Sequence, residues 1–203
     1  RKNKHTKIIC IADNIIPHEK RIGDKLFTKY FLKSCDAFIT MSEKVMSDLR
    51  LFQKEKPAIL VSHPLYDNFG EIISKEEARR KLNLNQEEKI ILFFGFIRKY
   101  KGLDLLYEAM ADERIKESGE YYEDAKTYNE QIEKLGIKNQ LVLKTDFIPD
   151  SEVKYYLCAA DAVIQPYRNA TQSGVTPLAY HFEKPMIVTN VGGLPFLVPH
   201  EKV

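Results

Sequence analysis

Two loops in the last third of the chain combine glycines and hydroxyl-bearing side chains in a pattern suited to binding phosphate. An apolar run at 162–165 leads into a loop ending in Ser173-Gly174, and a later apolar run leads to Gly192-Gly193. The first turn of a helix has unpaired N–H groups and a partial positive charge, so anions bind there. We expect Ser173 to cap a helix and the glycines to let the backbone approach a ligand. A glycine pair can also be a simple turn, but together the two loops predict one phosphate site.

Arg98 and Lys101 are the cations best placed to serve such a site. They lie three residues apart, directly after an apolar run, and Gly102 follows them at the predicted start of a helix. Both side chains can project over the sheet edge toward Ser173-Gly174, where they would stabilise the charge of a diphosphate leaving group. The alternative is a solvated basic turn with no ligand.

Alternating strands and helices must position these loops. Apolar runs predict strands at 7–11, 37–41, 58–61, 89–96, 140–143 and 162–165 and a buried strand after Pro185. Helical periodicity predicts helices at 20–33, 42–51, 74–82, 103–110, 122–135 and 150–159 and after Gly174. Ser42 and Ser74 are the expected N-caps of two of them. This alternation is typical of an α/β fold with parallel sheets.

The alternation fails at one place. No apolar run that could form a strand separates the helix ending near Ile115 from the helix starting near Tyr122. Parallel βαβ topology needs a strand there, so we expect residues to be missing from the chain after Lys116.

Four blocks of the chain resemble the retaining glycosyltransferases of the large fourth family, which have the GT-B fold and use nucleotide-sugar donors. The blocks are 93–102, 147–161, the Ser173-Gly174 loop and 184–193. The resemblance implies a Rossmann-like donor-binding domain and the terminal part of a second Rossmann-like acceptor domain. It assigns 1–56 to the C-terminal portion of the acceptor domain, 57–70 to the interdomain linker and 71–203 to an incomplete donor-binding domain.

The resemblance also implies roles for residues on the donor side. The family's phosphate-binding lysine matches Lys101. Its phosphate-binding arginine usually stands at the position of Phe96, and the matching residue here is Arg98, two residues further along the chain. A nucleotide base is expected near Phe147-Ile148-Pro149, and Tyr167 is placed to contact the sugar or base. The full expected donor-binding set is Gly95, Arg98, Lys101, Phe147, Ile148, Tyr167, Thr171, Gln172, Ser173, Gly174, Gly192 and Gly193.

The chain departs from the family at its pair of glutamates, which are spaced E-x-x-x-x-x-x-x-E. Those positions hold Ala170 and Leu178, and the glutamate that often follows the glycine pair is replaced by Phe196. Thr171 and Gln172 could supply hydrogen bonds in their place. The departure keeps open a noncatalytic role in nucleotide-sugar binding or regulation.

On the acceptor side, a weaker likeness covers residues 8–50. Asp13 stands where the family often has an interdomain histidine, so we expect it to contact the transferred sugar or to take part in proton transfer. Asn14, His18 and Glu19 match an Asn-x-x-Pro-His-Glu loop and are the expected acceptor-binding residues. An ordinary turn and a surface His-Glu pair would explain the same residues. The expected catalytic set consists of Asp13, Arg98 and Lys101.

The resemblance implies transfer of a hexose from a nucleotide-diphosphate sugar to a glycan or lipid-linked acceptor, with retention of anomeric configuration. Retaining transfer in this family is commonly described as attack on the face that the diphosphate leaves, with a donor phosphate oxygen assisting the acceptor proton. No cofactor or metal is expected, because the sequence has no Asp-x-Asp or His cluster and cationic side chains can replace a metal. An unrelated flavodoxin-like or Rossmann nucleotide binder is disfavoured because no G-x-G-x-x-G follows the predicted strand at 7–11 or the one at 89–96.

Bulk properties narrow the partners further. The 31 Lys and Arg against 29 Asp and Glu do not argue for nucleic acid. Three widely spaced cysteines and the lack of a membrane span or signal peptide favour a cytoplasmic protein. The 20–33 segment pairs an apolar stripe with a basic face, which favours a helix packed on its own core and leaves open peripheral contact with the inner membrane face. The stripe is Leu26, Phe27, Tyr30 and Phe31, and the basic residues are Lys20, Arg21, Lys25, Lys29 and Lys33.

Overall fold

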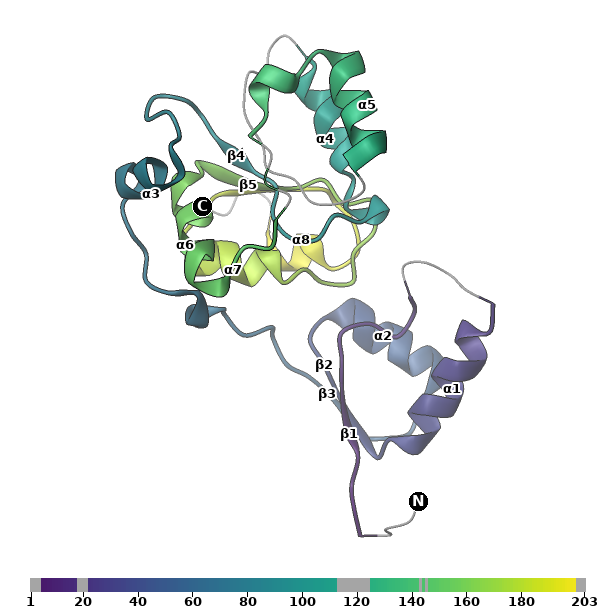
Figure 1. Cartoon of the computed structure of the whole chain (residues 1–203). Coiled ribbons are helices and arrows are strands. Elements are labelled where there is room, and N and C mark those ends of the chain that lie inside the picture. The colour runs from purple at the N-terminus through teal and green to yellow at the C-terminus, as the bar shows by residue number, and fades with distance from the viewer. Residues whose placement is uncertain (1–4, 18–21, 113–124, 143, 145, 200–203) are drawn as a thin grey trace.

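The computed structural model describes residues 5–17, 22–112, 125–142, 144 and 146–199, and shows two parallel three-stranded sheets, one in each half of the chain (Figure 1). A segment that includes a short 3-10 turn, η1 (Asp67–Phe69), connects the halves. We call them the N-terminal and C-terminal lobes. His18 and Glu19 and the expected gap after Lys116 lie outside the described residues. The domain boundaries stay a prediction.

The N-terminal lobe contains the strands β1 (Ile9–Ala12), β2 (Ala37–Thr40) and β3 (Ala58–Leu60), in that order and all parallel. The helices α1 (Asp24–Ser34) and α2 (Glu43–Phe52) connect them. Their core includes Leu32, Phe38 and Leu49. Ser42 caps α2 as expected, because its hydroxyl accepts a hydrogen bond from the Val45 N–H at 3.2 Å.

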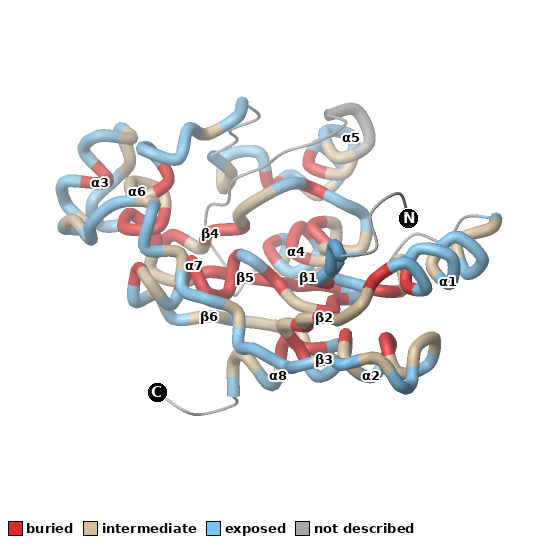
Figure 2. Tube along the Cα trace, turned by 90° about the horizontal axis from the view of Figure 1, so that it is seen from below, coloured by how far each residue is buried: buried red, intermediate tan, exposed pale blue. Residues whose placement is uncertain are grey.

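Helix α1 differs from its prediction. It begins at Asp24, and its apolar stripe does not pack into the lobe (Figure 2). Leu26, Phe27, Tyr30 and Phe31 are 56–76% exposed, and the helix buries Leu32 instead. The favoured interpretation of this stripe as core is therefore wrong for the residues described.

The C-terminal lobe contains β4 (Ile91–Leu92), β5 (Ala162–Gln165) and β6 (Met186–Val188), also parallel and in that order. Two core clusters form on this sheet. One involves α3 (Lys75–Leu82), α6 (Asp150–Ala159) and α7 (Val175–His181). The other involves α4 (Leu103–Met110), α5 (Ala125–Leu135) and α8 (Leu194–Leu197). Two 3-10 turns, η2 (Lys99–Lys101) and η3 (Lys138–Gln140), complete the lobe.

Three strand predictions in this lobe need correction. The strand expected at 89–96 pairs with β5 only at Ile91 and Leu92, after which the chain turns toward Gly95. In the stretch expected to be a strand from residue 140, Gln140 ends η3 and residues 141–142 form no strand, and no described strand pairs with β4 on its free side. The strand after Pro185 lies at the sheet edge, with Ile187 53% exposed. In each case the strand depends on a neighbour that local periodicity does not reveal.

The start of β4 is fixed by a buried ionic network. Asp161 accepts a hydrogen bond from the Ile90 N–H at 2.8 Å and another from the guanidinium of the fully buried Arg79 at 2.8 Å. Arg79 also donates to the carbonyl oxygens of Ala159, Asn85, Gln86 and Glu88. This network holds the strand that leads to Arg98 and Lys101. Within the described part of the chain, no helix has both the length and the apolar character needed to cross a bilayer.

Candidate functional site

The loops that follow β4 and β5 are joined by direct backbone contact. Gly102 has a positive φ of 67°, and a Cβ there would overlap the carbonyl oxygen of Pro166. The same two loops are also joined by a hydrogen bond, in which the Arg168 N–H donates to the carbonyl oxygen of Tyr100 at 2.7 Å. Only glycine allows this approach, so the cationic loop is held against the loop that carries Ser173.

The loop after β6 is joined to the same loop in the same way. Gly192 has a φ of 55°, and a Cβ there would overlap the carbonyl oxygen of Ala170. A Cβ on Gly193 would overlap the carbonyl oxygen of Thr171, and the Gly193 N–H donates to Ala170 O at 3.2 Å. The prediction that the two glycine-containing loops share one sheet edge is confirmed.

Lys101 is directed toward the start of α7. A Cβ on Gly95, whose φ is 91°, would lie 3.2 Å from Lys101 Nζ and 3.7 Å from the side chain of Val175. The same Nζ lies 5.7 Å from the centre of the Tyr167 ring, within cation–π range. The structure therefore brings Gly95, Lys101 and Tyr167 together beside α7. Arg98 precedes η2 with an exposed side chain, and its carbonyl oxygen accepts the Lys101 N–H at 2.8 Å.

Ser173 and Tyr167 form a hydrogen-bonded pair beneath this cluster. The Ser173 hydroxyl accepts from the Val175 N–H at 3.2 Å. The N-cap of α7 is Gly174, so Ser173 binds the first helical N–H from one residue before the capping position expected for it. Its oxygen also lies 3.4 Å from the Tyr167 hydroxyl. Burial raises the pKa of Tyr167 to about 12, with the Ser173 hydrogen bond opposing the shift. The phenol therefore stays protonated at neutral pH, and its ring presents a neutral face to Lys101.

Asp13 reaches across from the N-terminal lobe to these loops. Gln172 Nε2 donates to Asp13 Oδ1 at 3.1 Å, and the Thr171 hydroxyl donates to the Asp13 backbone oxygen at 3.4 Å. A Cβ on Gly193 would lie 3.7 Å from Ser42 Cβ, so the lobes also approach there. Asn14 follows Asp13 and is exposed. The structure thus brings the expected acceptor-side carboxylate to the expected donor-side loop.

The positions of the missing glutamates are filled by core side chains. Ala170 is 1% exposed and Leu178 is 3% exposed, and each belongs to one of the two core clusters. Neither position faces open space. Phe196, at the third position, is 75% exposed. That Thr171 and Gln172 supply hydrogen bonds to a ligand in place of these glutamates stays a prediction.

The residues expected around the nucleotide base directly precede α6. Phe147 is 74% exposed, and Ile148 packs against the core formed with α3, α6 and α7. Pro149 follows as the N-cap of α6. A base contact at Phe147-Ile148 stays a prediction.

Two residues of the connecting segment reach the site and were not expected there. The Tyr66 hydroxyl lies 3.3 Å from His63 Nε2, and the same hydroxyl lies 3.3 Å from where a Gly174 Cβ would be. The sequence indicates only a linker at this point. The usable signal is an aromatic residue and a histidine three apart in a segment that must pass between the lobes.

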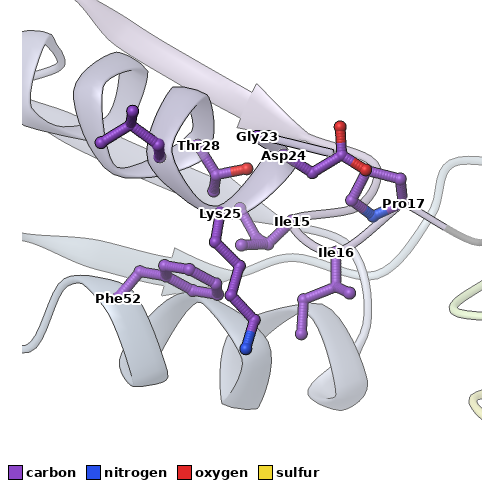
Figure 3. Close-up of a pocket in the computed structure, with 9 residues that line it drawn as sticks. Ile15, Ile16, Pro17, Gly23, Asp24, Lys25, Thr28 and Phe52 are labelled. Atoms are coloured by element: carbon purple, nitrogen blue, oxygen red, sulfur yellow. The ribbon is translucent and has the colours of Figure 1, made fainter. Parts of the chain in front are cut away.

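An apolar pocket of about 380 Å³ adjoins the Asp13-Asn14 loop (Figure 3). The next residues of that loop line it together with the first turns of α1 and the end of α2. A second hollow of about 520 Å³ includes Asp13 and Asn14 themselves and shares Ile15, Pro17 and Thr28 with the first as lining residues. The pocket is lined by Ile15, Ile16, Pro17, Gly23, Asp24, Lys25, Leu26, Thr28 and Phe52.

The described residues contain no group of three or more His, Cys, Asp or Glu side chains placed to hold a metal ion. What they contain is a set of loops at the carboxyl ends of one parallel sheet, faced by a carboxylate from a second parallel-sheet lobe. Ligands of open α/β sheets bind at such edges. Fold and geometry together define a two-lobed α/β protein in which loops carrying Arg98, Lys101 and Ser173 lie at one sheet edge and Asp13 of the other lobe contacts them.

Comparison with known proteins identifies the family. The model of the glycosyl transferases group 1 family matches residues 74–203, and the chain belongs to this family. A D-inositol 3-phosphate glycosyltransferase of Corynebacterium urealyticum is 27% identical over 209 residues, which cover 94% of this chain and 48% of that protein. The chain spans about half the length of the curated relatives it matches most extensively.

Solved structures show the same fold. A sucrose-phosphate synthase from Thermosynechococcus elongatus superposes with a TM-score of 0.80 at 19% identity, covering 93% of this chain and 51% of that one. The Anabaena HepE protein in complex with UDP-glucose gives 0.81 at 17% identity, covering 96% and 56%. The GT-B fold predicted from the sequence is confirmed.

Proposed function

We propose that the whole protein transfers a hexose from a nucleotide-diphosphate sugar to a glycan or lipid-linked acceptor, with retention of anomeric configuration. The observation that carries the proposal is the position of Lys101 Nζ, beside Gly95 and the start of α7, where three loops meet at one sheet edge. A diphosphate needs a cation and close backbone approach, and this junction offers both. The structural relative solved with UDP-glucose supports this type of donor.

The chemistry follows from the charges at the junction. When the bond from the anomeric carbon to the diphosphate oxygen breaks, negative charge develops on the leaving group. Lys101 and Arg98 stabilise that charge without a metal. The acceptor oxygen forms the new bond on the same face and passes its proton to a donor phosphate oxygen. Asp13 contacts the transferred sugar from the other lobe.

The acceptor side supports an acceptor with an apolar part. The pocket beside Asp13 and Asn14 is apolar, and the second hollow, which includes both residues, is also lined by α1. The exposed apolar stripe of α1 is accompanied by Lys25, Lys29 and Lys33. We therefore extend the proposal to a cytoplasmic protein whose α1 contacts the anionic inner membrane face.

A second candidate is a noncatalytic nucleotide-sugar binding or regulatory protein on the same scaffold. The observation that favours it is the burial of Ala170 and Leu178 at the positions of the family's two glutamates. A ribose hydroxyl has no carboxylate acceptor at either position. Such a protein would bind donor but not turn it over.

One experiment separates the two candidates. Calorimetry on the whole protein with UDP-, GDP- and ADP-sugars measures binding, and hydrolysis and transfer assays with and without EDTA measure turnover and its metal dependence. Lys101→Ala and Arg98→Ala should each lower turnover by orders of magnitude without unfolding the protein, whereas the exposed Lys54→Ala should not. NMR of the product reports its anomeric configuration.

Each outcome has a meaning. Binding without turnover supports the second candidate, and near-normal turnover in both cation variants removes their catalytic role. Failure to bind any nucleotide sugar refutes both candidates. Loss of activity in EDTA contradicts metal independence, and an inverted product contradicts retention.

Membrane contact has its own test. The whole protein should sediment with anionic phosphatidylglycerol vesicles but not with neutral phosphatidylcholine vesicles, and added salt should weaken the association because it screens the lysines. Lys29→Glu should bind anionic vesicles more weakly than the wild type at the same salt concentration. No binding to anionic vesicles at low salt rejects this part of the proposal.

A further inference from the structure

The side-chain amide of Gln172 has a hydrogen-bond partner for its nitrogen but none for its oxygen. Its Nε2 donates to Asp13 Oδ1 at 3.1 Å across the gap between the lobes. Its Oε1 is buried and, in the part of the chain that the structure describes, has no hydrogen-bond partner. Gln172 thus lies at the interlobe junction with a free acceptor.

The orientation of this amide is set by chemistry. A carboxylate can only accept hydrogen bonds, so the NH₂ group must face Asp13 and the oxygen must face away. A buried acceptor without a donor costs about 1–3 kcal/mol. A ligand hydroxyl beside Oε1 would remove that cost.

The backbone on either side of Gln172 is held in place. The Thr171 hydroxyl donates to the Asp13 backbone oxygen at 3.4 Å, and the carbonyl oxygen of Thr171 lies against Gly193. On the other side, the Ser173 hydroxyl accepts a hydrogen bond from the Val175 N–H at 3.2 Å. With both neighbours fixed, the amide cannot move far from Asp13.

We propose that Gln172 is both a specificity-determining and a positioning residue. Its Oε1 accepts a hydrogen bond from a hydroxyl of the transferred sugar, while its Nε2 holds the Asp13 carboxylate toward that sugar. This inference rests on the proposed function. It assigns the carboxylate at the sugar to the acceptor lobe, since Ala170 and Leu178 leave none at the matching donor-lobe positions.

Three variants of the whole protein test the two ends of the amide separately. Gln172→Leu removes the donor and the acceptor. Gln172→Glu keeps an acceptor for the sugar but places a second carboxylate against Asp13. Asp13→Asn combined with Gln172→Glu restores a hydrogen bond between the lobes with the charge on the other side. The matched controls are Gln86→Leu and Gln86→Glu, at an exposed position in the loop before β4.

The probes are UDP-glucose and UDP, or GDP-mannose and GDP, whichever pair the wild-type protein binds. Gln172→Leu should bind the nucleotide sugar roughly tenfold more weakly and the parent diphosphate within about twofold, because only the sugar contact is lost. A deoxy analogue that lacks the recognised hydroxyl should lose affinity for the wild type but not for Gln172→Leu.

Turnover reports on the positioning role. Gln172→Glu should lower kcat because the two carboxylates repel each other. The combined variant should keep nucleotide-sugar binding but should not recover kcat, since its carboxylate now lies on the wrong lobe. Full recovery of kcat would refute the assignment of Asp13 as the positioned group.

The remaining outcomes are also decisive. If Gln172→Leu weakens the parent diphosphate as much as the nucleotide sugar, Gln172 has only a structural role and the inference fails. If it weakens neither, the inference also fails, while the proposed function stands. If the wild type binds no nucleotide sugar, the proposed function fails first and the inference falls with it.

Discussion

The two sides of the site are built in different ways. On the donor side, three loops meet through backbone atoms at Gly102, Gly192 and Gly193, where any side chain would overlap a carbonyl oxygen. On the acceptor side, Asp13 reaches the same loops through hydrogen bonds from the Gln172 and Thr171 side chains at 3.1 and 3.4 Å. The donor side is therefore fixed by the fold, whereas the bonds between the lobes can exchange with a ligand.

The largest expected effect comes from breaking the donor side at Gly102. Gly102 and Gly136 have nearly the same φ, 67° and 68°, but a Cβ on Gly136 would meet nothing within 4 Å. Gly136→Ala should cost only the left-handed strain of about 1–2 kcal/mol. Gly102→Ala adds a collision with Pro166 and should lose at least twice as much. Urea unfolding of both variants measures the difference.

The same pair of variants separates stability from ligand binding. Gly102→Ala should abolish nucleotide binding at a temperature where most of the protein is still folded, because the loop carrying Lys101 moves away from Pro166. Gly136→Ala should bind as the wild type does. Equal losses of stability in the two variants would show that the contact at Gly102 is not needed.

The sequence predicts the elements of the donor side better than the contacts between the lobes. Helices α3, α4 and α6 end where their periodicity places them, and the Ser74 cap forms as expected, because these signals are local. The glycines of the loops are also visible in the sequence. Which carbonyl each one meets depends on how neighbouring strands align.

Other features had no local signal. The pairing of β4 over two residues and the absence of a strand at 140–142 depend on which strand lies alongside. The Asp13–Gln172 bond joins residues 159 positions apart in the sequence. Tyr66 reaches Gly174 only because the connecting segment folds back against α7. The sequence makes Asp13 and Gln172 candidate site residues but does not reveal that they pair.

An intermediate effect is expected from filling the acceptor-side pocket at Thr28. With alkyl glycosides as acceptors, the wild-type KM should fall as the chain lengthens, because each buried CH₂ contributes about 0.8 kcal/mol. Thr28→Phe should abolish this dependence and leave donor hydrolysis unchanged. Lys29→Phe, at the next and exposed position of α1, is the matched control. If the KM of Thr28→Phe still depends on the length of the alkyl chain, the chain does not bind in this pocket.

The smallest effect is expected at Tyr167, where the donor side can be altered without moving its backbone. Tyr167→Phe removes a 3.4 Å hydrogen bond to Ser173 but keeps the ring beneath Lys101, so it should cost about 1 kcal/mol or less at neutral pH. Burial raises the folded-state pKa to about 12, above the ordinary value of about 10. The stability that this group contributes is therefore present below about pH 10 and is lost as the pH rises toward 12. Urea unfolding between about pH 7 and 11 should show a flatter alkaline decline for Tyr167→Phe than for the wild type or the exposed control Tyr30→Phe. Identical declines in all three proteins would show that the Tyr167 phenol is not buried in solution.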